Sequence, residues 1–279
     1  MKTHSPLPFL VTFDGEARSG KGTIVQATKD YLRDECGYKV MLIDAGQVFR
    51  VLVVGATNAG VDMEDAESID TFLGNDAEAD KCVQLVKDVY HMNKEERDAL
   101  LYTNEVGANS AKIGARPLSQ AFKDELLKKW LRDARAEGYE VVLLDGSSLE
   151  AVGQMLEGEG LCRFVIGLYF VCNPVTGARR TLGHANTDYE DLEADSRAAV
   201  DELVAQIIAR NEADRNREVQ PIARPSGAPI FELPSVDVYK KTTNRFMATI
   251  DTSAKMTKKE MSLPVATVVA AQLAAYSSN

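Results

Sequence analysis

A cluster of glycines followed by one lysine, near the start of the chain, has the composition of an anion-binding loop. Gly15 and Gly20 are five residues apart in the segment GEARSGKGT, and Lys21 comes directly after Gly20. A loop of this kind turns successive backbone N–H groups toward one point, and the positive end of a following helix adds to their field. The ammonium group of Lys21 would then reach the terminal phosphates of a nucleotide.

The simpler interpretation of this segment is a tight turn with a surface lysine. Its surroundings favour the phosphate-binding interpretation, because an apolar run over 8–14 precedes it and helical spacing follows from residue 21. The common form of such loops has Ser or Thr directly after the lysine. Here Gly22 takes that place, and Thr23 comes one residue later.

Asp145 is a second candidate, since it ends the apolar stretch VVLLDG. An acid at the end of a buried strand helps to hold Mg²⁺ in phosphate-loop proteins. Many buried strands nevertheless end in Asp because this residue favours turns. The sequence leaves both interpretations open.

The segment 209–221, ARNEADRNREVQP, is dense in arginine. Arg210, Arg215 and Arg217 lie within two helical turns, with Asp214 among them. One interpretation is a solvated helix face with local ion pairs. The other is a phosphate clamp, because the planar guanidinium fork binds phosphate oxygens through two hydrogen bonds.

The elements that must position these residues alternate between strands and helices. Short apolar runs predict five strands, at 8–14, 38–46, 139–148, 164–171 and 245–251. Such alternation indicates a mostly parallel sheet with helices on both faces, and in such folds ligands bind beyond the carboxyl ends of the strands. The first three strands end in Asp14, Asp44 and Asp145, each followed by glycine within two residues.

The predicted helices cover most of the remaining chain. Apolar periodicity and end signals predict them at 21–35, 47–54, 77–92, 93–102, 117–138, 194–217 and 257–276. Asn93 is a candidate cap, Pro117 fits a first turn, and Trp130 is expected to pack into the core. The segment 218–245 holds four of the nine prolines and is expected to be an extended loop or lid appendage.

Composition narrows the class of protein. The net charge of −10 argues against a protein that coats nucleic acid, and no run of 18 apolar residues or secretory signal is visible. The four cysteines form no C-x-x-C pair, so we expect buried, reduced thiols at Cys36, Cys82, Cys162 and Cys172. We therefore expect a cytoplasmic protein that binds small molecules, with no nucleic acid polymer or membrane as partner. A monomer is the expected state, although no residue pattern determines it.

Several of these motifs together resemble the cytidylate kinases, a family within the nucleoside monophosphate kinases. The form with Gly22 and Thr23 after the lysine matches that group. In chain order, the segments that carry the resemblance are FDGEARSGKGT, DAGQVFRVL at 44–52, NEVGANSAKIGARP at 104–117, LLDG, RNEADRNREVQP and IDTSAKMTKKE at 250–260. The phosphate loop is generic, whereas the Asp-x-Gly-x-x-aromatic-Arg and Asp-Arg-Asn-Arg elements are more specific.

This resemblance implies a fold and an activity. The fold is α/β, the three-layer αβα sandwich of P-loop NTPases with a central parallel five-stranded sheet. One kinase domain would cover 1–279, with a helical acceptor-binding insertion at 57–116 and a lid with an extended appendage at 178–245. The activity would be transfer of a phosphoryl group from ATP, with Mg²⁺, to CMP or dCMP.

The resemblance also implies roles for individual residues. ATP would be bound by the loop residues Gly15, Arg18, Ser19, Gly20, Lys21, Gly22 and Thr23, and the metal by Thr23 and Asp145. The catalytic side chains would be Lys21, Arg50, Arg215 and Arg217, with Arg179 or Arg180 joining Arg215. The acceptor nucleotide would contact Asp44, Gly46, Phe49, Arg50, Asp145, Asp214 and Arg217, with Phe49 in the place of the usual tyrosine.

The sequence departs from the family on the acceptor side. Ala45 stands where the family has Ser or Thr, and Ser147 and Ser148 stand where it has Arg and Asp. By the same alignment Ala111 replaces a base-contacting serine, and Gln120 replaces an acceptor-site arginine. Such losses change selectivity strongly. Two alternatives therefore stay open: a kinase for another nucleotide or small phosphorylated metabolite, and a nucleotide-binding regulatory protein without phosphotransfer.

Overall fold

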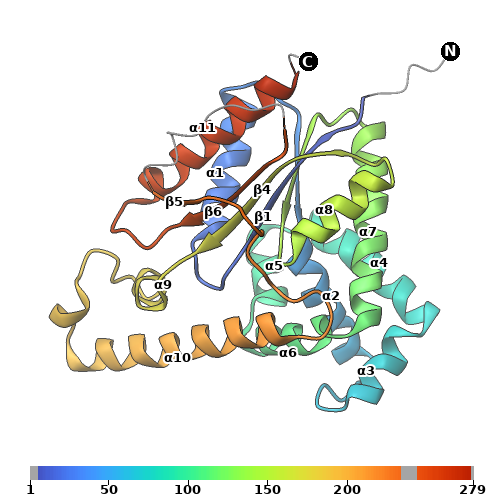
Figure 1. Ribbon diagram of the computed structural model, residues 1–279. Helices are drawn as coiled ribbons and strands as arrows, with labels where there is room; N and C mark the ends of the chain where they lie inside the picture. Colours follow the sequence, from blue (N-terminus) through green and yellow to red (C-terminus); the bar gives the residue numbers. More distant parts are fainter. Residues whose placement is uncertain (1–5, 234–243, 278–279) are drawn as a thin grey trace. The chain divides into compact units, whose positions relative to one another are not determined.

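The computed structural model describes residues 6–233 and 244–277, which divide into two compact units (Figure 1). The sheet unit comprises the described parts of Met1–Ile43, Leu131–Asn216 and Pro221–Asn279. The helical unit comprises Asp44–Trp130 and Arg217–Gln220. Each unit is described by itself below.

The sheet unit is built on a six-stranded sheet with the order β2-β3-β1-β4-β6-β5. The strands are β1 (Phe9–Gly15), β2 (Val40–Asp44), β3 (Val141–Asp145), β4 (Arg163–Val171), β5 (Ile230–Glu232) and β6 (Phe246–Asp251). The pairs β1–β3, β1–β4, β4–β6 and β5–β6 are parallel, and Phe13 lies opposite Asp145. The five expected strands are thus present, and the expected α/β fold with a parallel sheet flanked by helices is confirmed.

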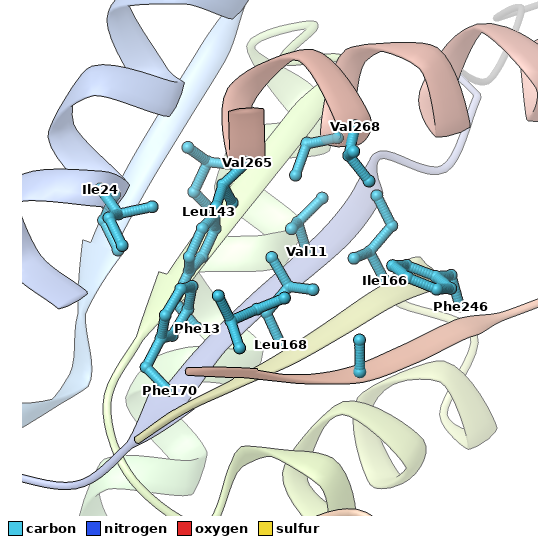
Figure 2. Packing of buried hydrophobic residues seen from close by; sticks show 14 of the residues in the cluster. Val11, Phe13, Ile24, Leu143, Ile166, Leu168, Phe170, Phe246, Val265 and Val268 are labelled. Atoms are coloured by element: carbon cyan, nitrogen blue, oxygen red, sulfur yellow. The ribbon is translucent and has the colours of Figure 1, made fainter. Parts of the chain in front are cut away.

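The strands could be found in the sequence because they are buried on both faces. Almost every residue of β1, β3 and β4 is buried, and such strands appear as continuous apolar runs. Figure 2 shows Val11, Phe13 and Leu168 packed beneath Ile24 of one helix and Val265 and Val268 of another. This packing fixes the carboxyl ends of the strands, where the candidate site residues begin.

The sixth strand, β5, corrects the expectation of five. It lies in the segment expected to be an extended loop, and it pairs in parallel with β6, Phe231 opposite Ile250. Phe231 also packs against the main apolar cluster of the sheet. With only three residues and a proline on each side, the strand gives little periodic signal, and an edge strand tolerates proline.

Helices cover both faces of the sheet (Figure 1). The sheet unit contains α1 (Lys21–Asp34), α8 (Leu149–Gly158), α9 (Pro174–Thr181), a short 3₁₀ turn (Tyr189–Asp191), α10 (Ala194–Asn216) and α11 (Lys258–Ser277). The expected helices α1, α10 and α11 are confirmed. The short helices α8 and α9 were not predicted, although Asn173 caps α9 and Pro174 occupies its first turn, which is a readable start signal.

The helical unit surrounds a separate apolar core. It contains α2 (Ala45–Asn58), α3 (Ala66–Leu73), α4 (Asp76–His91), α5 (Lys94–Leu101), α6 (Asn104–Gly114) and the first part of α7 (Pro117–Ala136). Asn93 caps α5 as expected, accepting a hydrogen bond from the Glu96 backbone N–H at 2.9 Å. Trp130 packs against the cluster formed by Val48, Leu52 and their neighbours.

Three further expectations concern the chain as a whole. Cys82, Cys162 and Cys172 are buried free thiols as expected, but the expectation is wrong for Cys36, which follows α1 and is exposed. Within the described ranges, no helix is long and apolar enough to cross a membrane. The insertion expected at 57–116 and the lid expected at 178–245 stay predictions, and 234–243 of the lid lie outside the described residues.

Candidate active site

The loop between β1 and α1 starts at a position that only glycine can occupy. Gly15 has φ +143°, and a Cβ built there would lie 2.3 Å from the Phe170 carbonyl oxygen of β4. The next backbone N–H, that of Glu16, donates to the same carbonyl at 2.9 Å. The loop therefore leaves the sheet in one fixed direction, set by the close approach of two strands.

The loop ends at Gly20, which caps α1 in a left-handed conformation with φ +80°. A Cβ at Gly20 would lie 2.9 Å from the Met261 Sδ of α11. Beside Gly22, in contrast, no described atom lies within 4 Å of a built Cβ. The first turn of α1 is therefore open on the side of Gly22, which is exposed.

Lys21 is the first residue of α1, and its side chain reaches the carboxyl end of β3. Its Nζ donates to the Gly146 carbonyl at 2.7 Å and to the Phe13 carbonyl at 3.4 Å, and it forms an ion pair with Asp145. Both side chains of the pair are about one-fifth exposed, 18% and 19%. The two residues singled out in separate motifs are therefore in contact, with solvent access to the charged groups.

Asp14 braces the loop and was not among the expected site residues. One carboxylate oxygen accepts from the Gly15 N–H and the other from the Leu149 N–H of α8, both at 2.7 Å. The residue is 6% exposed. A buried carboxylate that accepts from two backbone N–H groups holds the start of the loop in place. The sequence indicated this residue only as the acid that ends the first predicted strand.

The end of α10 contacts the loop through two side chains. The Arg215 Nη2 lies 2.6 Å from the Glu16 Oε1, and the buried Asn211 Oδ1 accepts from the Ala17 N–H at 2.9 Å. Arg210, by contrast, is exposed and lies 3.8 Å from Asp214 on the helix surface. Local ion pairs are therefore present in the arginine-rich segment, and its role as a phosphate clamp stays a prediction.

Ser19 contributes a buried polar group inside the loop. It is 1% exposed, and its hydroxyl has no hydrogen-bond partner among the described residues. Its carbonyl accepts from the Thr252 hydroxyl at 2.8 Å, which fixes the loop to the end of β6. A buried hydroxyl without a protein partner is suited to meet a ligand oxygen.

A small pocket of about 60 Å³ lies between α9 and the loop that follows β6. Its lining includes Thr176, Arg179, Arg180, Asp188, Ser253 and Lys255. The Arg180 Nη2 donates to the Ala254 carbonyl at 2.7 Å, and Arg179 lies 3.5 Å from Asp188. Both arginines that were expected to join Arg215 thus line one pocket of the sheet unit.

In the helical unit, Arg50 is held on an aromatic platform. Its guanidinium carbon lies 4.5 Å from the centre of the Tyr102 ring, and its Nη1 donates to the Leu101 carbonyl at 2.9 Å. The Tyr102 hydroxyl donates to the Asp44 carboxylate at 3.2 Å. Burial and the nearby charge of Asp44 raise the pKa of Tyr102 to about 12. Tyr102, missed by the sequence analysis, therefore connects two expected acceptor residues.

The other residues expected to bind the acceptor also belong to this unit. Asp44 caps α2 by accepting from the Gln47 N–H at 3.1 Å, and a Cβ at Gly46 would lie 3.2 Å from that carboxylate. Phe49 packs against α6, where a Cβ at Gly114 would lie 3.5 Å from its ring. The Arg217 Nε donates to the Gln220 carbonyl at 2.6 Å.

The expected site residues therefore fall into two groups. The sheet unit brings together the loop from Gly15 to Thr23, with Asp145 and Arg215 in contact with it. Asp214 adjoins Arg215 on α10, and its carbonyl accepts from the Ile222 N–H at 3.0 Å. The helical unit carries Asp44, Gly46, Phe49, Arg50 and Arg217.

Comparison with known proteins agrees with the motif resemblance. No family model matches the chain. The chain is 24% identical to a cytidylate kinase of Photobacterium profundum over 247 residues, which cover 88% of this chain and 95% of that protein. It is 27% identical to one of Aliivibrio salmonicida, covering 85% and 93%, and 26% identical to one of Shewanella oneidensis, covering 80% and 86%. The similarity to cytidylate kinases along most of the chain is therefore confirmed.

Proposed function

We propose that this protein is a nucleoside monophosphate kinase that transfers the terminal phosphoryl group of ATP to a nucleoside monophosphate, with CMP or dCMP as the first candidate acceptor. The observation that carries the proposal is the contact of Lys21 with Asp145 and the Gly146 carbonyl, beside a loop whose glycines are sterically required. The relatives named cytidylate kinase, matched over most of their length, support the same activity.

The residues of the loop fit a bound triphosphate. The open space beside Gly22 and the unpartnered, buried hydroxyl of Ser19 are two features that phosphate oxygens would use. Lys21 would move from Asp145 to the terminal phosphates, since an ammonium group on a flexible stem can exchange one anion for another. The pocket at Arg179 and Arg180 would extend the ATP site.

Mg²⁺ would neutralise charge on the transferred phosphoryl group. Thr23 and Asp145 are the residues proposed to hold it, together with phosphate oxygens. Among the described residues, no three acidic, histidine or cysteine side chains are grouped as a protein-only metal site. A metal held partly by the substrate needs no such group.

The proposed reaction requires charge neutralisation and alignment more than a strong base. An oxygen of the acceptor phosphate forms a bond to the γ-phosphorus, the bond from that phosphorus to the bridging oxygen breaks, and ADP leaves. Lys21 and Arg215 would neutralise the phosphates of ATP, and Arg50 and Arg217 those of the acceptor. Asp44, Gly46, Phe49 and Asp214 would contact the acceptor nucleoside.

The test is acceptor-dependent formation of ADP from ATP, measured with a panel of nucleoside monophosphates that includes CMP and dCMP. Lys21→Ala should abolish turnover, whereas Lys81→Ala on α4, at a side chain that is 71% exposed, should leave it unchanged. Turnover with another monophosphate alone would retain the class of enzyme and change the acceptor. ATP binding without acceptor-dependent ADP would indicate a regulatory nucleotide-binding protein, and unchanged turnover in Lys21→Ala would refute both kinase proposals.

The proposal includes a monomeric, cytoplasmic enzyme whose partners are nucleotides. Sedimentation of the full chain with and without ATP tests the monomer directly. A stable dimer would require that part of the proposal to be withdrawn.

A further inference from the structure

We propose that Lys123 is a positioning residue for the acceptor site, acting through Gln220 on Arg217; this inference rests on the proposed function. Lys123 is on α7, in the part of the helix that belongs to the helical unit. It is 1% exposed, which is rare for a lysine. Burying an ammonium group destabilises the folded state unless the group is paired and hydrogen-bonded. The partners of Lys123 therefore indicate what it does.

The ammonium group of Lys123 joins two glutamines that are far apart in the sequence. Its Nζ donates to the Gln120 Oε1 at 3.0 Å and to the Gln220 Oε1 at 2.7 Å. It also forms an ion pair with Asp124, at 3.0 Å from the Oδ1. One charge thus holds α7 to the segment that carries Arg217.

The connection to Arg217 runs through the backbone of Gln220. The Gln220 carbonyl accepts from the Arg217 Nε at 2.6 Å. Gln220 has φ +49°, a left-handed conformation that is uncommon for a residue other than glycine. Its side chain is held at both ends, by Lys123 at the Oε1 and by Asp124 at the Nε2, 3.2 Å away. Lys123 therefore helps to maintain the turn that orients the Arg217 guanidinium.

The same ammonium group explains the glutamine that stands in place of an expected arginine. Gln120 is 3% exposed, its Nε2 donates to the Gly114 carbonyl, and its Oε1 accepts from Lys123. Gly114 is the residue against which Phe49 packs. Gln120 is thus used to tie α7 to α6 beneath Phe49, and the positive charge lies one helical turn further along, at Lys123. In this proposal Arg50 and Arg217 are the arginines that bind the acceptor phosphate.

The test compares Lys123→Met, which removes the charge, with Lys123→Arg, which keeps it, and with Lys81→Met as an exposed control. Lys123→Met should raise KM for CMP about tenfold while KM for ATP stays within about twofold, because misplaced groups lose alignment with one substrate only. Lys123→Arg should restore most of the loss. Equal effects on both substrates would indicate a merely structural role and overturn the inference.

A second variant keeps the test decisive if Lys123→Met does not fold. Gln220→Asn tolerates the left-handed backbone but is one methylene too short to reach Lys123, so it should give the same rise in KM for CMP. The Nε–Hε signal of Arg217 in a ¹⁵N–¹H spectrum, assigned with Arg217→Lys, reports the hydrogen bond to Gln220 without any turnover. Its exchange with water should quicken about tenfold in both variants. An unchanged signal in both overturns the inference.

The outcomes separate this inference from the proposed function. A wild-type enzyme that phosphorylates CMP, with both variants unchanged, leaves the function and removes the role of Lys123. A wild type that forms no ADP with any monophosphate removes the function; CMP affinity by calorimetry then replaces KM, and a tenfold loss in both variants supports the role of Lys123. Absence of both turnover and CMP binding overturns the two together.

Discussion

Glu16 of the phosphate loop and Arg215 of α10 form an ion pair, with the Arg215 Nη2 2.6 Å from the Glu16 Oε1. The carboxylate is 9% exposed and the guanidinium 46% exposed. A carboxylate in this position faces the same arginine that a bound triphosphate would attract. The ion pair therefore competes with the proposed phosphate contact of Arg215.

This competition predicts the effect of Glu16→Gln. Removing the negative charge should lower KM for ATP about threefold, because Arg215 becomes available and the repulsion of the phosphates ends; the half-exposed guanidinium limits the gain. Steady-state kinetics with varied ATP measure it, and Glu35→Gln, an exposed acid just after α1, is the matched control. A rise in KM for ATP would mean that Glu16 serves to position Arg215.

Gly15 and Gly22 form a second test, because the two glycines have opposite surroundings. Gly15→Ala places a Cβ 2.3 Å from a carbonyl oxygen at φ +143°, so we expect a loss of roughly 3 kcal/mol or more in the free energy of unfolding. Gly22→Ala meets no described atom within 4 Å and should leave stability nearly unchanged while weakening ATP binding. Denaturant unfolding and ATP titration of both variants measure the two effects.

The reverse result would refute this account of the loop. If Gly22→Ala keeps full ATP affinity, the space beside α1 is not where phosphates bind. If Gly15→Ala folds with normal stability, the approach of β1 to β4 is looser than the Cβ position implies.

The sequence predicted the parts of this protein that follow from local patterns. The buried strands appear as apolar runs, and the acids that end them lie at one edge of a parallel sheet, which is why Lys21 and Asp145 could be expected near each other. The edge strand β5 was missed because a strand of three residues, with prolines close by on both sides, is too short to show a periodic pattern.

The missed site residues depend on contacts between distant segments. In the sequence, nothing distinguishes Lys123 from any other lysine of a predicted helix, and such lysines are nearly always exposed to solvent. Its role depends on Gln220, 97 residues further along the chain. Tyr102 likewise gains its role only because α5 ends beside Arg50 of α2. Residue types and spacing do not contain such pairings.

Tyr102 supports a third prediction, on the platform beneath Arg50. Tyr102→Phe keeps the ring and removes only the hydroxyl that donates to Asp44, so KM for CMP should change by less than about threefold. Tyr102→Ala removes the ring and should raise KM for CMP about tenfold, with KM for ATP unchanged. If both variants bind CMP equally well, the guanidinium of Arg50 does not depend on this ring.

The pKa of Tyr102 gives the last prediction, on stability at high pH. Its pKa is raised from 10.0 to about 12, first by burial and then by the charge of Asp44, although Arg50 and Gln47 act in the opposite direction. Because the folded state keeps the phenol proton that the unfolded chain releases, the stabilisation is complete below pH 10 and is lost as pH rises through about 12. The difference in free energy of unfolding between wild type and Tyr102→Phe should therefore decrease over this interval. Denaturant unfolding at a series of pH values measures it, with Tyr90→Phe, at a tyrosine that is 78% exposed, as the control. A difference that stays constant up to pH 12 would mean that the Tyr102 hydroxyl titrates alike in the folded and the unfolded chain.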